Sequence, residues 1–151
     1  MLNMLKSVSI VSAVLLLAAC ASGPKYDDMK SSIPQLASDQ GRIYFYRSSS
    51  SIGAAVQPSI LLNGEKVGTS KPGGFFYVDR PAGKYEASCS TEATNKVDFM
   101  LAAGQERYVK THVEMGFLVG HVKPELIAPD QGTLDIQSLS YAPNKETSAA
   151  K

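Results

Sequence analysis

The sequence predicts a mainly β protein, an antiparallel β-sandwich of about 7–8 strands. Segments rich in β-branched and aromatic residues recur about every ten positions, and Gly, Pro or Asn separates them. With 151 residues, the chain has room for one domain with appendages. Its 15 Lys and Arg against 14 Asp and Glu give a formal net charge of +1, so no nucleic-acid partner is expected.

The first predicted strand, residues 42–47, is the most aromatic part of the chain. Its alternation puts Ile43 and Phe45 on one face and Tyr44 and Tyr46 on the other. Further strands are predicted over residues 59–62, from 65 onward, and over 75–78, 84–90, 96–101, 106–114 and 118–123.

Asn63-Gly64 predicts the tightest hairpin turn. Both residue types tolerate a positive φ, which a two-residue type I′ turn requires. The turn would pair Leu62 with Glu65 and Ile60 with Val67.

A second hairpin is predicted at Gly116-Phe117, where glycine in the first position fits a type II′ turn. A two-residue loop there would pair Val113 with Gly120. The same register would set His112 opposite His121.

The last apolar residues allow two interpretations. Leu134, Ile136, Leu139 and Tyr141 fit either a final strand or a short helix that starts near Asp130. Their spacing does not distinguish the two.

The N-terminus has the features of a signal peptide over residues 1–19. Lys6 precedes an apolar stretch over residues 8–19, which as a helix would be about 18 Å long. A hydrocarbon core of about 30 Å is too thick for it to span. The small residues Ala18 and Ala19 are typical of a cleavage site.

Leu17-Ala18-Ala19-Cys20 resembles the lipobox of bacterial lipoproteins. The resemblance implies that Leu17, Ala18 and Ala19 are recognised by the signal peptidase and that Cys20 carries a diacylglycerol and an N-acyl group. Two or three chains hold a protein on a membrane permanently. In lipoproteins of Gram-negative bacteria, Asp after the cysteine favours retention at the inner membrane. This sequence has Ala21 there, so the resemblance implies the periplasmic face of the outer membrane.

Residues 20–40 have two prolines and no sustained apolar period, which predicts a flexible tether. Its root-mean-square reach of roughly 25 Å would lift the domain clear of the lipid headgroups. The β-sandwich domain is then expected over 41–142, and a disordered tail over 143–151.

Four segments occur in an order that resembles the bacterial lipoprotein family catalogued as domain of unknown function 2846. They are Gly-Arg-Ile-Tyr-Phe-Tyr-Arg (41–47), Leu-Asn-Gly-Glu-Lys-Val-Gly (62–68), Gly-Phe-Phe-Tyr-Val-Asp-Arg-Pro-Ala-Gly-Lys-Tyr (74–85) and Ala-Gly-Gln-Glu-Arg-Tyr-Val (103–109). The resemblance implies a prealbumin-like β-sandwich and a short C-terminal helix over 130–141. It transfers no functional residue except Cys20.

Two candidate sites involve residues that can bind metal or react. Cys89 is expected to be a small buried side chain rather than a reactive thiol. His112 and His121 form a weak candidate metal pair, to which Glu114 could add a ligand, although neighbouring lysines would repel a cation. No metal and no cofactor is therefore predicted.

The remaining candidates are polar or aromatic. Adjacent Asp27 and Asp28 point to opposite sides of an extended chain, and the serines of 48–51 lack a nucleophile elbow. Gly73-Gly74 lacks the Lys-Ser/Thr of a phosphate loop. A possible ligand patch consists of Tyr44, Tyr46, Phe75 and Tyr77, unless a further layer of the fold covers them.

The sequence thus favours a non-enzymatic, lipid-anchored protein-interaction module in the bacterial envelope. Its expected partners are the membrane, through Cys20, and an envelope protein or glycan. The alternatives are a glycan- or small-ligand-binding module that uses the aromatic face, and an enzyme with a metal at the two histidines.

Overall fold

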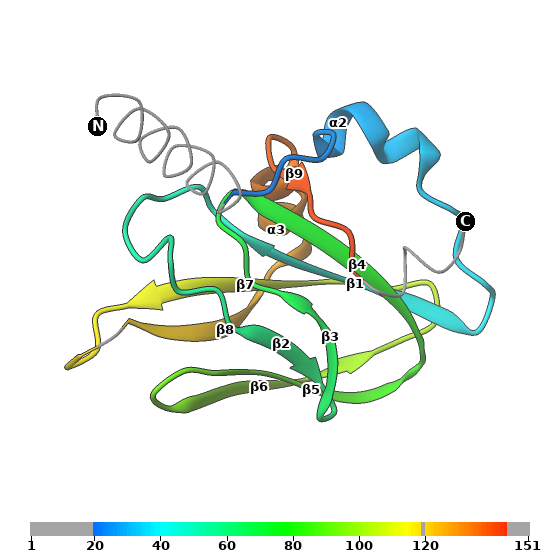
Figure 1. Cartoon of the computed structure of the whole chain (residues 1–151). Helices are drawn as coiled ribbons and strands as arrows, with labels where there is room; N and C mark the ends of the chain where they lie inside the picture. The colour runs from blue at the N-terminus through cyan, green and yellow to red at the C-terminus, as the bar shows by residue number, and fades with distance from the viewer. Residues whose placement is uncertain (1–19, 119, 145–151) are drawn as a thin grey trace, which may run out of the picture.

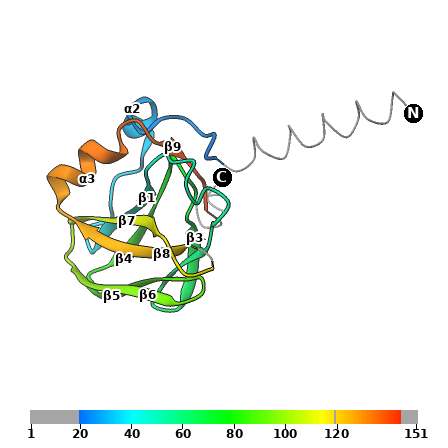
Figure 2. The same cartoon turned by 90° about the vertical axis from the view of Figure 1, so that its left-hand side faces the viewer.

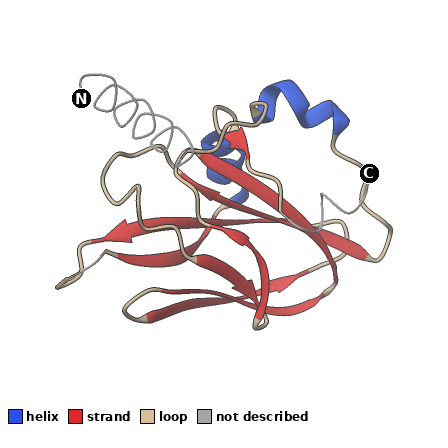
Figure 3. Ribbon diagram, in the orientation of Figure 1, coloured by secondary structure: helices blue, strands red, loops and turns tan. Residues whose placement is uncertain are grey.

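The computed structural model describes residues 20–118 and 120–144. In that part of the chain, two β-sheets face each other, and helices cover the outer face of one of them (Figure 1, Figure 3). In chain order the elements are α2 (Tyr26–Met29), η1 (Lys30–Ser32), β1 (Gln40–Arg47), β2 (Ser59–Leu62), β3 (Glu65–Thr69), β4 (Gly74–Pro81), β5 (Gly83–Ser90), β6 (Thr94–Leu101), β7 (Glu106–Glu114), β8 (His121–Ile127), α3 (Pro129–Ile136) and β9 (Ser140–Tyr141).

The strand order is β8-β7-β1-β4-β9 in the larger sheet and β3-β2-β5-β6 in the smaller one. The predicted mainly β, sandwich-like fold is therefore confirmed. The larger sheet is mixed rather than purely antiparallel, because β1 pairs in parallel with β7 and β4 in parallel with β9.

The main core lies between the two sheets. Ile43 and Phe45 of β1 point into it, as the alternation predicted, and both are fully buried. Phe45 stacks on Phe76 of the adjacent β4 with ring centroids 5.2 Å apart.

A second apolar layer covers the other face of the larger sheet. Tyr44 stacks on Tyr108 of β7 with centroids 5.0 Å apart, and Ile136 of α3 belongs to the same buried cluster. In Figure 2, α3 lies beside the outer face of this sheet. Gly132 lets the helix approach this closely, since a Cβ there would lie 2.3 Å from Cγ of Tyr108. The predicted helix is confirmed over Pro129–Ile136, but it ends before Tyr141, which pairs with Phe75 as part of β9. Strand β1 is buried on both faces.

The Asn63-Gly64 turn is confirmed. Both residues have positive φ, 49° and 82°, and Leu62 pairs with Glu65. Ile60 pairs with Gly68 instead of Val67, because a register irregularity between Ile60 and Leu61 shifts the pairing by one residue.

The predicted register of the β7–β8 hairpin is wrong. Val113 pairs with Val122, and His112 pairs with Lys123 instead of His121. The observed register puts two β-branched apolar side chains directly opposite each other, and Val122 is fully buried in the main core. The connection is consequently longer than a two-residue turn.

The prediction of a flexible tether over 20–40 is also wrong. The backbone N–H of Gly23 donates to the carbonyl of Tyr141 at 3.2 Å, and that of Tyr26 donates to Leu139 at 3.0 Å. The Tyr26 ring packs edge-on against Phe75, with centroids 5.5 Å apart. This aromatic anchor and the backbone bonds compensate the entropy that fixing the segment costs.

The two ends of the chain extend beyond the described residues. The signal-peptide residues Leu17, Ala18 and Ala19 lie outside them, as do residues 145–151 of the predicted tail. Asn144, which was assigned to that tail, is buried with 6% exposure. Within the described ranges, no helix combines the length and apolarity that crossing a membrane requires.

Candidate functional site

Several chain segments meet at one end of the larger sheet. Arg47, the last residue of β1, lies opposite Gly74, the first residue of the antiparallel β4. β7 runs parallel to β1 and therefore ends here with Glu114. β9 starts here with Ser140, which also pairs with Gly74.

Cys20 lies at the same end, and its side chain is exposed. The N–H of the next residue, Ala21, donates to the carbonyl of Pro72 at 3.3 Å, two positions before β4 begins. A hollow of about 410 Å³ adjoins the cysteine, with Lys71 and Tyr141 among its lining residues. We call this end of the molecule the Cys20 end.

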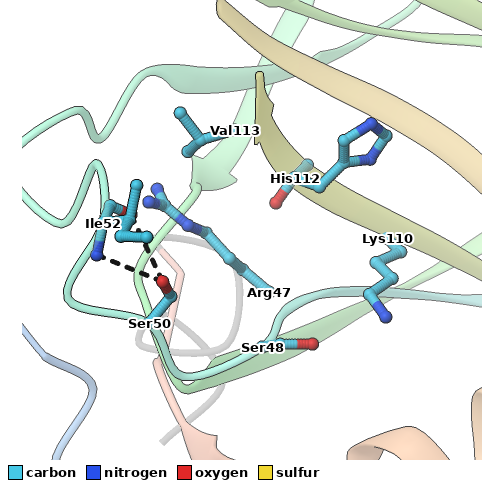
Figure 4. Close-up of a pocket in the computed structure, with 8 residues that line it drawn as sticks. Arg47, Ser48, Ser50, Ile52, Lys110, His112 and Val113 are labelled. Carbon is cyan, nitrogen blue, oxygen red and sulfur yellow. Dashed lines mark hydrogen bonds between the residues drawn. The ribbon is translucent and has the colours of Figure 1, made fainter. Parts of the chain in front are cut away.

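A second hollow, of about 260 Å³, lies at the Cys20 end between β7 and the loop that follows β1 (Figure 4). Ile52 and Val113 give it an apolar wall, and Lys110 and His112 project from β7. Ser50 stabilises the loop locally, because its Oγ accepts a hydrogen bond from the N–H of Ile52 at 3.1 Å.

Arg47 forms the polar base of this hollow and was not singled out from the sequence. Its guanidinium is buried and donates to the carbonyls of Gly53 at 2.8 Å and Val56 at 2.7 Å. It also donates to the carbonyl of Ser70 at 3.4 Å. Burial lowers the pKa of this guanidinium. Its bonds to three carbonyls hold the loop against the end of β1.

Thr111 and Ser70 are likewise engaged in the fold. Their hydroxyl oxygens are 2.8 Å apart, and the Thr111 hydroxyl donates to the carbonyl of Tyr46 at 3.3 Å. The hydroxyl groups of Thr111 and Ser70 therefore link chain segments inside the fold.

The two histidines belong to different clusters. His112 lies 3.3 Å from Glu114, and His121 lies 3.7 Å from Glu92. The Lys123 ammonium, 2.6 Å from Glu114, lowers the pKa of that carboxyl, and His112 adds to the effect. The opposed histidine pair is wrong, and no group of three potential metal-ligating side chains occurs within residues 20–118 and 120–144.

Of the two interpretations of the aromatic set, coverage by a further layer of the fold is the one that the structure shows for three of its four rings. Tyr44, Tyr46 and Phe75 are at most 2% exposed, because the N-terminal segment and α3 cover them. Tyr77 is partly exposed, but the Arg42 guanidinium lies over its ring, 4.6 Å from the centroid. This layer is a second core of the fold.

The hydroxyl of Tyr46 connects the second core to α3. It donates to Asp135 at 2.8 Å, and Lys110 lies 3.3 Å from the same carboxylate oxygen. Burial favours the neutral carboxyl, but hydrogen bonds from Gln131, Tyr46 and Lys110 outweigh it and lower the pKa of Asp135. The cluster joins β1, β7 and the helix.

Cys89 matches its prediction as an inert core residue. It is fully buried among the apolar side chains of the main core. Burial raises the pKa of its thiol to about 12, so the reactive thiolate is scarce at neutral pH.

Asp27 and Asp28 lie in α2, where Asp27 pairs with Lys30 at 2.9 Å on the surface. A stronger ion pair connects β1 to β4, since Asp79 accepts from Arg42 at 2.7 and 2.8 Å. Sequence reasoning missed this pair because the two residues are distant in the chain, and neither belongs to a motif.

The described residues form a small β-sandwich, and the cysteine at position 20 is exposed at one end of its larger sheet. The chain belongs to the family described as protein of unknown function (DUF2846), whose model matches residues 37–122. The matched stretch runs from just before β1 to the start of β8, so it contains neither Cys20 nor α3. No curated protein and no solved structure matches the chain.

Proposed function

We propose that this protein is a lipid-anchored lipoprotein of the bacterial envelope, whose β-sandwich is a non-enzymatic protein-interaction module. The observation that carries the proposal is Leu17-Ala18-Ala19-Cys20 directly after an apolar segment of signal-peptide length. The exposure of Cys20 supports it, because acylation needs an accessible thiol. The periplasmic face of the outer membrane is the proposed location, on the basis of Ala21 after the cysteine.

The non-enzymatic part of the proposal is supported by how the polar side chains are used. Arg47, Thr111 and Asp135 each bond to other parts of the fold, and Cys89 is buried with a raised pKa. Each of these three polar side chains thus links segments of the fold, and the thiol lies inside the main core.

Substitution of Cys20 by Ala tests the anchor in cells that express the full chain. We expect the variant to lose palmitate labelling and to leave the membrane fraction. Cys89→Ala is the matched control, because it removes the other cysteine while keeping the motif, and it should remain labelled. Labelling of Cys20→Ala equal to that of the parent protein would refute the anchor, as would a mature chain that still carries residues 1–19.

The interaction module is tested by chemical cross-linking in intact cells, followed by mass spectrometry of the adducts. We expect a reproducible envelope-protein partner whose cross-links map to the sandwich. Cross-links confined to the protein itself would contradict the proposal.

A further inference from the structure

Large exposed apolar side chains are concentrated at the Cys20 end. The loop between β7 and β8 carries Met115, Phe117 and Leu118, which are 86%, 96% and 83% exposed. Ile52, 69% exposed, lies in the neighbouring loop, which packs so closely on β7 that a Cβ at Gly53 would lie 2.8 Å from Val113. We call Ile52, Met115, Phe117 and Leu118 the apolar tip.

The apolar tip and Cys20 face the same side of the molecule. β7 ends, and its loop begins, at the end of the sheet where Ala21 bonds to Pro72. The β7–β8 loop projects toward the left in Figure 1, the side on which the dark-blue start of the described chain lies. Both lie on the right in Figure 2.

Nothing in the described chain separates Cys20 from the folded domain. Ala21 and Gly23 are both hydrogen-bonded to the Cys20 end, to Pro72 and to Tyr141. Acyl chains on Cys20 would therefore hold this end of the sandwich at the headgroups, and the tip with it. An interfacial segment needs to reach only about 5–10 Å into the headgroup and acyl boundary.

The charges around the tip favour an uncharged lipid surface. Glu114 pairs with Lys123 at 2.6 Å, and Lys110 lies 3.3 Å from Asp135. These two lysines have acidic partners, so they add little net charge beside the tip, while Lys71 in the hollow next to Cys20 is a further basic side chain at this end. Apolar contact is the main contribution that this surface can make.

We propose that the apolar tip inserts into the lipid interface of the membrane to which Cys20 is anchored, and that this second contact fixes the orientation of the sandwich. The inference rests on the proposed acylation of Cys20. The apolar tip thus contacts the bilayer surface, rather than a partner protein or a second copy of this chain.

Depth measurement on the full-length, acylated protein tests this. Leu118→Cys is labelled with an environment-sensitive fluorophore, and the protein is reconstituted into phosphatidylcholine vesicles that contain spin-labelled lipids. Cys89 is fully buried and should not react with the label. Met100→Cys is the matched control, because Met100 is 59% exposed and lies on β6, bonded through its carbonyl to Arg107 at the opposite end of β7.

We expect the fluorescence emission of the probe at position 118 to shift to the blue on binding to vesicles. The spin-labelled lipids should quench it severalfold more than they quench the probe at position 100, with little dependence on salt concentration. In Met115→Ser with Phe117→Ser, the quenching at Leu118 should fall to the Met100 level while the protein stays on the vesicles. Equal quenching at Leu118 and Met100 in the parent protein would overturn insertion.

Other occupants give different results, and each of these overturns the inference. Shielding of the Leu118 probe that grows with protein concentration in the absence of vesicles would indicate a second copy. Shielding only in native membranes, and not in pure vesicles, would indicate a partner protein. Failure of the proposed function is detected separately, since an unacylated Cys20 would itself take up the label and be found by mass spectrometry.

Discussion

The β2–β3 turn and the β7–β8 loop both connect antiparallel neighbours, but only the first consists of residues that the fold requires. Asn63 adopts a positive φ, and its side-chain oxygen accepts a hydrogen bond from the N–H of Glu86 at 2.8 Å. The β7–β8 loop instead exposes Met115, Phe117 and Leu118 to solvent. Exposed apolar side chains contribute little to the stability of the fold, so the need to fold does not explain why this loop carries three of them.

Among substitutions that test this difference between the two loops, Asn63→Val in the β2–β3 turn should have the largest effect on stability. Valine strongly disfavours the positive φ and removes the bond to Glu86, so the free energy of unfolding should fall by about 2–3 kcal/mol. Urea denaturation measures it. Asn63→Gly is the control that keeps the turn conformation and loses only the side-chain bond, so it should cost about 1 kcal/mol. Equal losses in both variants would show that strain is not the cause.

Gly64→Val should have an intermediate effect. The residue has a φ of 82°, and no heavy atom lies within 4 Å of a Cβ placed there. Backbone strain is then the only penalty, about 1–2 kcal/mol, and it should appear as a lower Tm. An unchanged Tm would contradict a left-handed conformation at this position.

Met115→Ser combined with Phe117→Ser should change the free energy of unfolding by less than about 0.5 kcal/mol, because both side chains are already in solvent. The measurement is urea denaturation of the protein in the absence of lipid. Val122→Ser, at a fully buried position of the same hairpin, is the control and should be strongly destabilising. A loss above 1 kcal/mol in the double variant would mean that the loop packs against the domain.

The smallest expected effect is the dependence of stability on the protonation of Glu114, the last residue of β7. Lys123 and then His112 lower the pKa of Glu114 below 4.5, so the folded state favours the carboxylate. This stabilisation is present above the unfolded pKa and is lost as the pH falls through the folded value. NMR titration of the Glu114 carboxyl should show the lowered pKa, and Lys123→Met should raise it. A pKa unaffected by that substitution would contradict the ion pair.

Features of the fold that depend on local chemistry could be predicted from the sequence. The conformational preferences of Asn63 and Gly64 are sufficient to predict the turn that they form. The alternation of side chains along β1 is sufficient to predict that Ile43 and Phe45 point into the core. The β7–β8 register was wrong because Gly116 fits a tight turn locally, whereas the pairing of Val113 with Val122 depends on the core that surrounds it.

The candidate site divides in the same way. Cys20 could be singled out because the residues that resemble a lipobox are contiguous in the sequence. Arg47 was missed because its carbonyl partners belong to loops whose positions are set by tertiary structure. Tyr26 looked like part of a linker because its contacts with Tyr44 and Phe75 join segments that are far apart in the chain.

The attachment of the first described residues depends on almost the last ones. Gly23 and Tyr26 bond to Tyr141 and Leu139, and the N–H of Tyr141 donates back to Pro24 at 2.8 Å. A chain that stopped before Leu139 would lose all three bonds while keeping every strand from β1 to β8. Its cysteine would then depend on the Ala21–Pro72 bond and the packing of Tyr26 on Phe75, so residues 139–141 supply much of what fixes residues 20–26 to the domain.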